Sequence, residues 1–286
     1  PQAPTPPAVD LGGPVLRVND FRIEGQTLLA TDTLLAALAG FKGRDLSFTQ
    51  LQEAAWVLVQ TYRSAGWLAH AVVPPQEIEG GIVTLRVVEA RLGMVRIEFP
   101  QGDLPRERIQ AMTDAHLEPG KPLSLTQVDR LLMLLDDMPG VVAAANFVPG
   151  EQDGSTDVML TLGQDKALEA NVTVDNFGAI STGRVRTSAS LSLNNSAGMG
   201  DHLQLQAVAS EGSRYARVAY GVPVGVQGWR AGLHASQMNY ELVGNFAALQ
   251  ASGSSQTWGA TLSAPLIRQP THNLGGLLSA DRRRFN

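Results

Sequence analysis

The spacing of apolar residues changes near residue 168, and this change constrains the fold more than any other feature of the sequence. Upstream, apolar residues recur with the period of a helix between short strands; downstream, they alternate with polar or small residues over segments of about ten positions. The segment Arg184–Leu193 places Val185, Ala189, Leu191 and Leu193 on one face of a strand, and its arginines and serines on the other. A sheet with one apolar and one hydrophilic face is what a transmembrane β-barrel requires.

Three later segments repeat this alternation. Their apolar sets are Leu203, Leu205, Ala207 and Ala209; Trp229, Ala231, Leu233 and Ala235; and Trp258, Ala260, Leu262 and Ala264. Six or seven such strands are expected from Leu168 onward. A soluble β-sandwich alternates in the same way, with its apolar faces turned towards a protein core, so the pattern alone leaves both folds open. Tyr220, Trp229, Tyr240 and Trp258 are expected near strand ends, where amphipathic rings favour lipid headgroups.

Composition argues against several other classes of protein. Hydrophobic residues make up 44% of the chain, but no run approaches the roughly 20 apolar residues that a membrane-spanning helix needs. The absence of cysteine removes disulfides, thiolate metal ligands and cysteine nucleophiles. The net charge is -5 and the positive residues are scattered along the chain, which argues against a nucleic-acid binder.

No arrangement of residues indicates catalysis or a cofactor. The five histidines fall in separate elements, without the ligand spacing of a metal site. Gly198-Met199-Gly200 lacks the third glycine of a dinucleotide fingerprint, and we expect a tight turn there. Asp136 and Asp137 are adjacent on a helix and point in different directions, so we expect a solvated helix end. The sequence therefore predicts a protein that is not an enzyme and holds no metal or cofactor.

The first half of the chain contains one order of elements twice. Residues 16–90 are expected to form the strand Leu16–Ile23, a helix capped by Thr31 or Asp32, a helix beginning behind Ser47 or Thr49, and the strands Ala69–Pro74 and Ile82–Glu89. Residues 91–164 repeat the order with Gly93–Phe99, Pro105–Ala115, a helix capped by Ser124, Val142–Val148 and Thr156–Leu162. Residues 1–15 read as a proline-rich leader or linker, and residues 168–286 as the alternating strands.

Several short motifs resemble those of one protein family. They are Phe21-Arg22-Ile23-Glu24-Gly25, Tyr62-Arg63-Ser64-Ala65-Gly66-Trp67-Leu68, Val73-Pro74-Pro75-Gln76, Leu131-Leu132-Met133-Leu134-Leu135-Asp136-Asp137-Met138-Pro139-Gly140 and Asp175-Asn176-Phe177-Gly178. Through these motifs taken together, the chain resembles the N-terminal part of a two-partner secretion outer-membrane transporter of the haemolysin/haemagglutinin secretion-activation type. The resemblance implies an α+β plus all-β fold: two tandem polypeptide-transport-associated (POTRA) domains, each βααββ, followed by the first strands of an antiparallel transmembrane β-barrel.

Six or seven strands cannot close around a pore without leaving backbone groups unpaired in lipid, so the barrel is expected to be incomplete in this chain. The resemblance implies export of a specific partner protein, such as an adhesin, a haemolysin or a toxin, across the bacterial outer membrane. The POTRA domains would lie in the periplasm, capture the unfolded client and pass it to a barrel pore, expected to be monomeric and surrounded by outer-membrane lipid. Two alternatives stay open: an outer-membrane protein insertase or assembly factor of the same superfamily, and a soluble POTRA-type binding module.

The resemblance also implies where the client binds. In this family the strand after the second helix, here Ala69–Pro74, forms the edge of a sheet, to which an unfolded client adds itself as a further strand. Pro74 and Pro75 would end the pairing, because proline has no N–H to donate. Candidates for an apolar groove beside this edge are Trp67, Leu68, Ala71, Val72 and Val73, although burial in the domain's own core explains the same residues equally well.

Basic residues mark the expected hydrophilic face. Arg184, Arg186, Arg217 and Arg230 fall on that face, where they would line the lumen and attract an acidic or polar client. The run Arg282-Arg283-Arg284 would contact lipopolysaccharide phosphates if it lies at the outer rim. Strand alternation favours a division of its side chains between the lumen and the rim.

Overall fold

A computed structural model describes residues 15–100, 102 and 104–286 of the chain. Within them, the chain divides into two compact units. The first comprises the described part of Pro1–Ile97 together with His116–Asp129 and Ala145–Leu160, and the second comprises the described parts of Glu98–Ala115, Arg130–Ala144 and Thr161–Asn286. The expected leader, residues 1–15, lies outside the described residues except for Val15.

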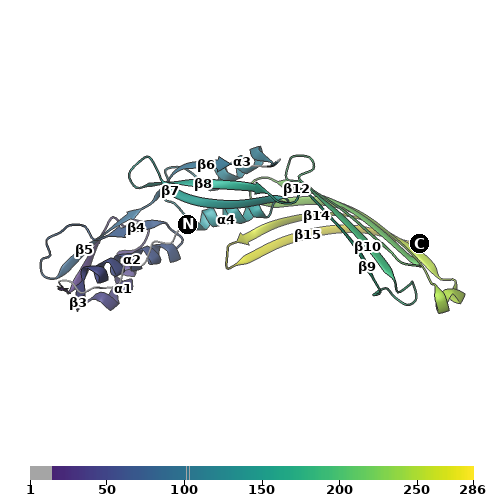
Figure 1. The fold of residues 1–286 in the computed structure, drawn as a ribbon, viewed down its shortest axis with the longest axis horizontal. Coiled ribbons are helices and arrows are strands. Elements are labelled where there is room, and N and C mark those ends of the chain that lie inside the picture. The colour runs from purple at the N-terminus through teal and green to yellow at the C-terminus, as the bar shows by residue number, and fades with distance from the viewer. Residues whose placement is uncertain (1–14, 101, 103) are drawn as a thin grey trace. The chain divides into compact units, whose positions relative to one another are not determined.

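The first module contains five strands and two α-helices (Figure 1). In chain order they are β1 (Val15–Val18), β2 (Asp20–Glu24), α1 (Thr31–Ala37), the 3-10 turn η1 (Ala39–Phe41), β3 (Arg44–Ser47), α2 (Phe48–Ser64), β4 (Ala69–Val72) and β5 (Ile82–Glu89). β2 lies parallel to β5, β4 lies antiparallel to β5, and the sheet order is β2-β5-β4. β1 and β3 form a separate antiparallel pair.

The expected single strand Leu16–Ile23 is wrong, because it is divided at Asn19 between these two sheets. The Asn19 backbone N–H donates to the Gly81 carbonyl oxygen (2.8 Å) and its side-chain amide donates to the Gly80 carbonyl oxygen (2.9 Å). These bonds hold the chain against the turn before β5. Nothing in the local hydrophobic pattern signals these pairings between distant segments. For the same reason β3, which pairs with β1 across about thirty residues, is absent from the sequence expectation.

The two helices differ in how they begin. Ser47 caps α2 as expected: its hydroxyl accepts from the Gln50 N–H, and the Gln50 side chain accepts from the Ser47 N–H in return. The core takes up one side of α2, through Leu51, Ala54, Ala55, Leu58 and Tyr62. The expected cap of α1 is wrong, because the helix begins at Thr31 behind Ala30 without a side-chain cap.

Glu89, at the end of β5, joins three segments of this module. Its carboxylate accepts from the Thr27 N–H (2.6 Å), the Leu28 N–H (2.8 Å), the Thr27 hydroxyl and the Tyr62 hydroxyl (2.7 Å). Burial raises the pKa of Glu89, but the hydrogen bonds from Thr27, Leu28 and Tyr62 outweigh it and leave the pKa below its usual value. Burial and the bond to Glu89 raise the pKa of Tyr62.

This network predicts acid sensitivity of the first module. Because the folded-state pKa of Glu89 is depressed, its stabilisation is present above the ordinary glutamate pKa of about 4.3 and is lost as the pH falls through the folded-state value. Glu89→Gln should lower the unfolding free energy at pH 7 by about 1 kcal/mol and flatten its decline below about pH 4.5. Hydrogen exchange of α2 amides, measured against pH, checks this. Glu24→Gln, an exposed glutamate of the same module, should change neither quantity; an equal effect would contradict the assignment.

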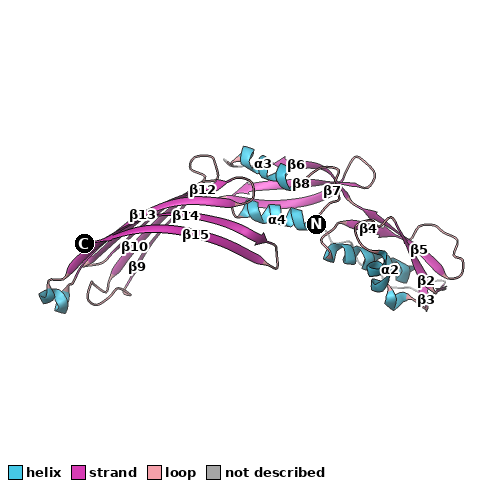
Figure 2. Ribbon diagram, turned by 180° about the vertical axis from the view of Figure 1, so that it is seen from behind, coloured by secondary structure: helices cyan, strands magenta, loops and turns pink. Residues whose placement is uncertain are grey.

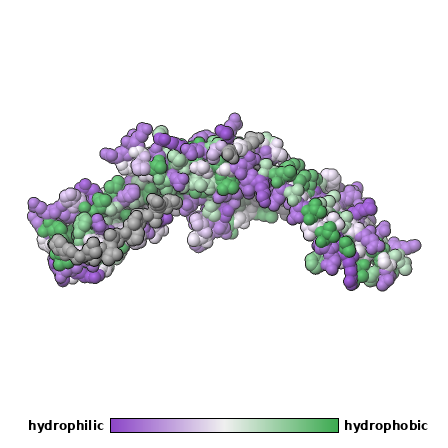
Figure 3. All heavy atoms as spheres, viewed as in Figure 1, coloured by the Kyte–Doolittle hydropathy of each residue, from purple (hydrophilic) through white to green (hydrophobic). Residues whose placement is uncertain are grey.

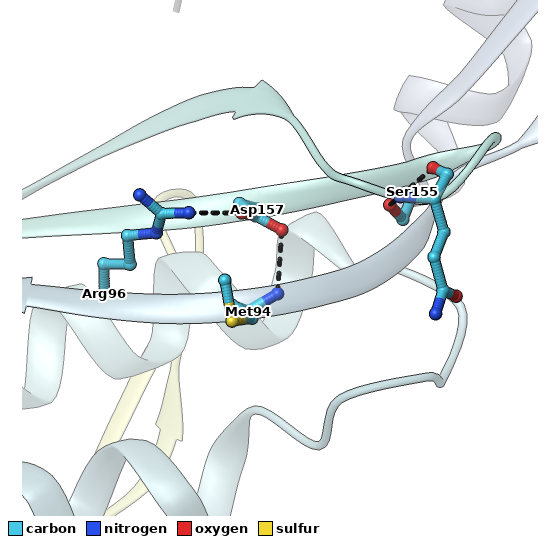
Figure 4. Close-up of polar contacts among 5 residues, drawn as sticks. Met94, Arg96, Ser155 and Asp157 are labelled. Carbon is cyan, nitrogen blue, oxygen red and sulfur yellow. Dashed lines mark hydrogen bonds and ion pairs between the residues drawn. The ribbon is translucent and has the colours of Figure 1, made fainter.

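The second module has the expected βααββ order. It consists of β6 (Arg91–Glu98), α3 (Arg106–His116), α4 (Leu125–Asp136), β7 (Val141–Pro149) and β8 (Ser155–Gln164), with sheet order β6-β8-β7. Ser124 caps α4 as expected, accepting from the Gln127 N–H. On β8, Asp157 is buried; its carboxylate accepts from the Met94 N–H (2.8 Å) and lies 3.5 Å from the Arg96 guanidinium (Figure 4). A side chain at Gly93 would come within 2.1 Å of that carboxylate, so a larger residue there would displace the Asp157 side chain from this position.

Seven antiparallel strands follow in one sheet, in chain order (Figure 2). They are β9 (Leu168–Asp175), β10 (Arg186–Asn194), β11 (His202–Ala209), β12 (Ser213–Val224), β13 (Trp229–Glu241), β14 (Ser252–Arg268) and β15 (Asn273–Phe285), and the 3-10 turn η2 (Gly244–Leu249) joins β13 to β14. The number of strands agrees with the expected six or seven. In the described parts of the chain, no helix is long and apolar enough to cross a membrane.

Candidate functional site

The strand register gives the seven-stranded sheet two chemically different faces. Residues paired across antiparallel strands lie on the same face, so the ladder carries the alternation of each strand to its neighbours. Two successive rows of one face, which we call the apolar face, are Leu168, Leu193, Leu203, Tyr220, Leu233, Ala260 and Ala280, then Ala170, Leu191, Leu205, Val218, Ala235, Trp258 and Arg282. The expected alternation is therefore confirmed across the sheet.

The apolar face lies open. Val172 is 72% exposed, Leu233 67% and Trp258 64%, and Figure 3 shows hydrophobic residues at the surface over this sheet. Monomeric soluble proteins rarely leave contiguous apolar surface of this extent uncovered. Within the described residues no second sheet covers this face, which is the covering that the β-sandwich alternative requires.

The expected placement of the aromatic residues is only partly right. Trp229 begins β13 and Tyr240 lies one residue before its end. Tyr220 and Trp258 lie inside β12 and β14, because both strands extend further than the alternating segments indicated. Tyr240 also pairs with Ser213 and Gly253, which puts it on the face opposite Trp258.

The opposite face, which we call the polar face, carries ion pairs and hydroxyl groups. Arg186 pairs with Asp175 at 3.1 Å, and His234 on β13 reaches Asp281 on β15 at 3.2 Å across Gly259. A side chain at Gly259 would lie within 2.0 Å of the Asp281 carboxylate, so glycine in the intervening strand is what allows the pair to form. The face can therefore contact water and polar backbone groups.

Three of the four arginines predicted to face a lumen lie on this polar face. Arg186, Arg217 and Arg230 share the face by register. Arg184 does not belong to the sheet: it lies in the loop before β10, where its carbonyl oxygen accepts from the Gly178 N–H. Arg217 and Arg230 border a hollow of about 200 Å³ together with His202 and His234. Sequence reasoning missed this cluster, because its members come from three strands.

The predicted client-binding strand, β4, is an edge strand, since β5 is its single neighbour in the sheet. The Ala90 N–H donates to the Leu68 carbonyl oxygen, and hydrogen-bonded pairs alternate along an antiparallel ladder. His70 and Val72 therefore direct their backbone groups towards β5, whereas Ala69 and Ala71 direct theirs away from it.

The chain itself closes one end of this edge. The Leu68 N–H donates to the Leu123 carbonyl oxygen (3.1 Å), and the Leu125 N–H donates to the Gly66 carbonyl oxygen (2.8 Å). Trp67 and Ser124 form an antiparallel bridge. The open part of the edge thus begins at Ala69.

The five groove candidates do not form one surface. Trp67, Ala71 and Val73 pack against the core of the first module. Val72 is 49% exposed, on the other side of the strand, and the backbone of Leu68 is bonded to the 123–125 segment. Main-chain pairing along Ala69–Val72 remains the feature suited to a client of any sequence.

Within the second unit, the ends of α3 and α4 hold the turns at one end of the sheet. Arg108 donates to the carbonyl oxygens of Met199 (3.2 Å) and Gly225 (2.9 Å), in the turns after β10 and β12. Arg268, at the end of β14, donates twice to the Asp137 carboxylate (2.8 and 2.7 Å). We call this the module end of the sheet; the turns after β9, β11 and β13 lie at the far end.

The structure corrects one expectation about this region and confirms another. Asp136 and Asp137 are not simply solvated, because the Asp136 carboxylate accepts from the Ala143 N–H (2.7 Å) and Asp137 binds Arg268. Gly198 and Gly200 do form a tight turn, whose Asn195 side chain accepts from the Gly200 N–H. Among the described residues, no group of three or more histidine, aspartate or glutamate side chains is arranged to hold a metal ion.

Known proteins match both halves of the chain. Residues 16–90 match the model of the ShlB-type POTRA domain, and residues 154–286 match that of the haemolysin secretion/activation protein ShlB/FhaC/HecB. The heme/hemopexin transporter protein HuxB of Haemophilus influenzae (strain 86-028NP) is 29% identical over 254 residues, 88% of this chain and 45% of HuxB. The outer membrane transporter CdiB of Dickeya dadantii is 26% identical over 281 residues, 94% of this chain and 49% of CdiB.

Solved structures share the fold. CdiB from Escherichia coli superposes with a TM-score of 0.69 at 22% identity, over 100% of this chain and 54% of CdiB. BamA from Haemophilus ducreyi lacking POTRA domains 1-3 gives 0.56 at 16% identity, over 94% of this chain and 51% of BamA. The chain spans about half the length of the curated relatives it matches. The chain is therefore similar to the ShlB-type POTRA domain over residues 16–90 and to the haemolysin secretion/activation family ShlB/FhaC/HecB over residues 154–286, and its two-faced antiparallel sheet agrees with these matches.

Proposed function

We propose that the full-length product of this gene exports a specific partner polypeptide across the bacterial outer membrane, and that this chain supplies its periplasmic modules and part of its barrel. The observation that carries the proposal is the seven-strand ladder that keeps one face apolar and exposed and the other polar. Such a sheet suits lipid on one side and a water-filled passage on the other. HuxB and CdiB are named as transporters, which supports the same reading.

The transport step uses binding and not bond chemistry. An unfolded client pairs with β4 through its main chain, so recognition does not depend on a single sequence. It then passes along the polar face, where hydroxyl and amide side chains replace water around its backbone. Folding of the client outside the membrane removes the unfolded chain and gives the movement its direction.

Secretion by the native gene product tests this function. In a strain deleted for the gene, one secreted polypeptide should disappear from the medium and accumulate in the periplasm, and the gene should restore its export. The transporter should fractionate with the outer membrane. A general loss of outer-membrane barrels would instead identify an assembly factor, and recovery of the gene product in the soluble fraction would identify a free binding module.

The arginines of the polar face are expected to set the rate of export. Arg186, Arg217 and Arg230 offer positive charge where an acidic or polar client passes. Replacing all three by glutamine should slow secretion several-fold, about 1 kcal/mol in barrier height, while the barrel still folds. Arg184→Gln is the matched control, since Arg184 lies in a loop, and should have little effect. Unchanged secretion by the triple variant in a pulse-chase assay would contradict the steering hypothesis.

A further inference from the structure

The apolar face changes character at the far end of the sheet, and the change is not uniform across the strands. One row nearer the far end than Leu205, the apolar face carries apolar side chains on β9 to β12, namely Val172, Ala189, Ala207 and Ala216. On β13 to β15 the same row carries polar ones, namely Gln237, Gln256 and Arg284. In the row of Leu205 itself, the apolar residues extend to Trp258 on β14 and end at Arg282 on β15. Polar residues therefore begin nearer the module end in β15 than in β9.

Such a diagonal boundary is expected where tilted strands cross the flat surface of a membrane. Barrel strands tilt by about 35–45°, so a line at constant depth crosses successive rows of the ladder. On β14 the apolar run from Trp258 to Ile267, which crosses the bulge between Pro265 and Ile267, spans about 27 Å along the strand, which corresponds to about 20 Å of depth at that tilt. Gln256 bounds the run at the far end, and at the module end β14 itself ends one residue after Ile267.

Two arginines stand at the far-end boundary without acidic partners. Arg282 lies opposite Trp258 and Arg284 lies opposite Gln256, both on the apolar face. Among the described residues, neither forms an ion pair, whereas Arg283 lies on the polar face, 3.9 Å from Asp281. The nearest acid by register on the apolar face is Glu241, two strands away on β13.

Their surroundings suit a phosphorylated lipid headgroup. A guanidinium binds phosphate oxygens through two parallel hydrogen bonds, and the long side chain can reach from the apolar band to the headgroup level. Gln237, Gln256 and Asn239 supply further donors on the same face. Trp258 adjoins them, and tryptophan favours that depth.

We propose that Arg282 and Arg284, with the neighbouring amides Gln237, Asn239 and Gln256, form a binding stripe for phosphate groups of outer-leaflet lipids. The inference rests on the proposed membrane location and adds a specific lipid contact to it. Because the second module holds the opposite end of the sheet through Arg108 and Asp137, the stripe faces the outer leaflet when the modules lie in the periplasm. The bound class is an anionic phosphorylated glycolipid.

The test uses the full-length gene product in phosphatidylcholine nanodiscs, with bis-phosphorylated lipid A added and bound lipid counted by native mass spectrometry. Replacing both Arg282 and Arg284 by glutamine should weaken lipid A binding about tenfold, as expected for the loss of two charge-assisted contacts. Arg283→Gln, the adjacent residue on the other face, should bind like the wild type. The double lysine variant should retain part of the affinity, because the charge remains and the planar fork is lost.

Equal binding by the double glutamine variant and the wild type would overturn the stripe, as would an equal loss in Arg283→Gln. Tight binding of dephosphorylated lipid A or of inorganic phosphate alone would also overturn it, since either would mean that the headgroup phosphate in its lipid is not what is recognised. Heat-modifiable migration on gels shows whether each variant is folded. Secretion measured in the same strains separates the two proposals: a failed lipid test with normal secretion leaves export standing, and absence from the outer membrane removes both.

Discussion

Arginine in place of Leu205 is expected to destabilise the membrane-inserted protein by about 2–4 kcal/mol, the cost of a charged side chain at the middle of the lipid-facing surface of a barrel. Leu205 lies on the apolar face between Leu191 and Val218 and is 39% exposed. No acidic residue shares its row in the described sheet. The charge would therefore enter hydrocarbon unpaired.

Gln204→Arg is the matched control. Gln204 is the preceding residue of the same strand, pairs with Ser192 and Ala219, and lies on the polar face. Arginine there should cost less than about 1 kcal/mol, because it meets water. Urea unfolding of the full-length protein from lipid vesicles, followed by tryptophan fluorescence, measures both changes. Equal costs at the two positions would mean that neither face contacts lipid.

Proline in place of Ala71 is expected to reduce secretion of the partner by about tenfold or more, because it removes a main-chain donor from the open edge of β4. The backbone of Ala71 points away from β5, so the substitution leaves the bonds of the β4–β5 ladder in place. Export should fall although the module stays folded. Crosslinking of the client to the first module should fall in parallel.

A second substitution controls for the case in which proline disrupts the local fold of the module. Val72→Lys places a charge on an exposed side chain of the same strand, which discourages pairing with a further strand without removing a backbone donor. It should also reduce crosslinking. Val142→Lys, on an exposed residue of β7 in the second module, should have little effect on client capture. Normal secretion by both β4 variants would exclude this edge as the capture site.

Features that depend on a repeating pattern could be predicted from the sequence. The alternation of β10, β11, β13 and β14, the number of strands and the Ser47 cap all follow from residues within one element. The edge position of β4 required the family resemblance in addition, because periodicity gives no pairing partners.

Features that depend on contacts between distant segments could not be predicted. Arg108 reaches carbonyl oxygens about a hundred residues away, and Arg268 binds Asp137 across a similar separation. Neither pair leaves a periodic signal. The bridge between Trp67 and Ser124 likewise closes part of an edge that the sequence presented as open.

The measurement that tests the account most directly is the environment of successive residues along β11. The sequence contains no cysteine. Single cysteines can therefore be introduced at positions 203 to 207 of a cysteine-free form of the full-length protein and labelled in intact outer membranes. We predict that positions 203, 205 and 207 react with a lipid-soluble maleimide and resist a charged, water-soluble one, and that positions 204 and 206 show the reverse. Uniform reaction with the water-soluble reagent at all five positions would contradict the membrane-spanning sheet and the transport function built on it.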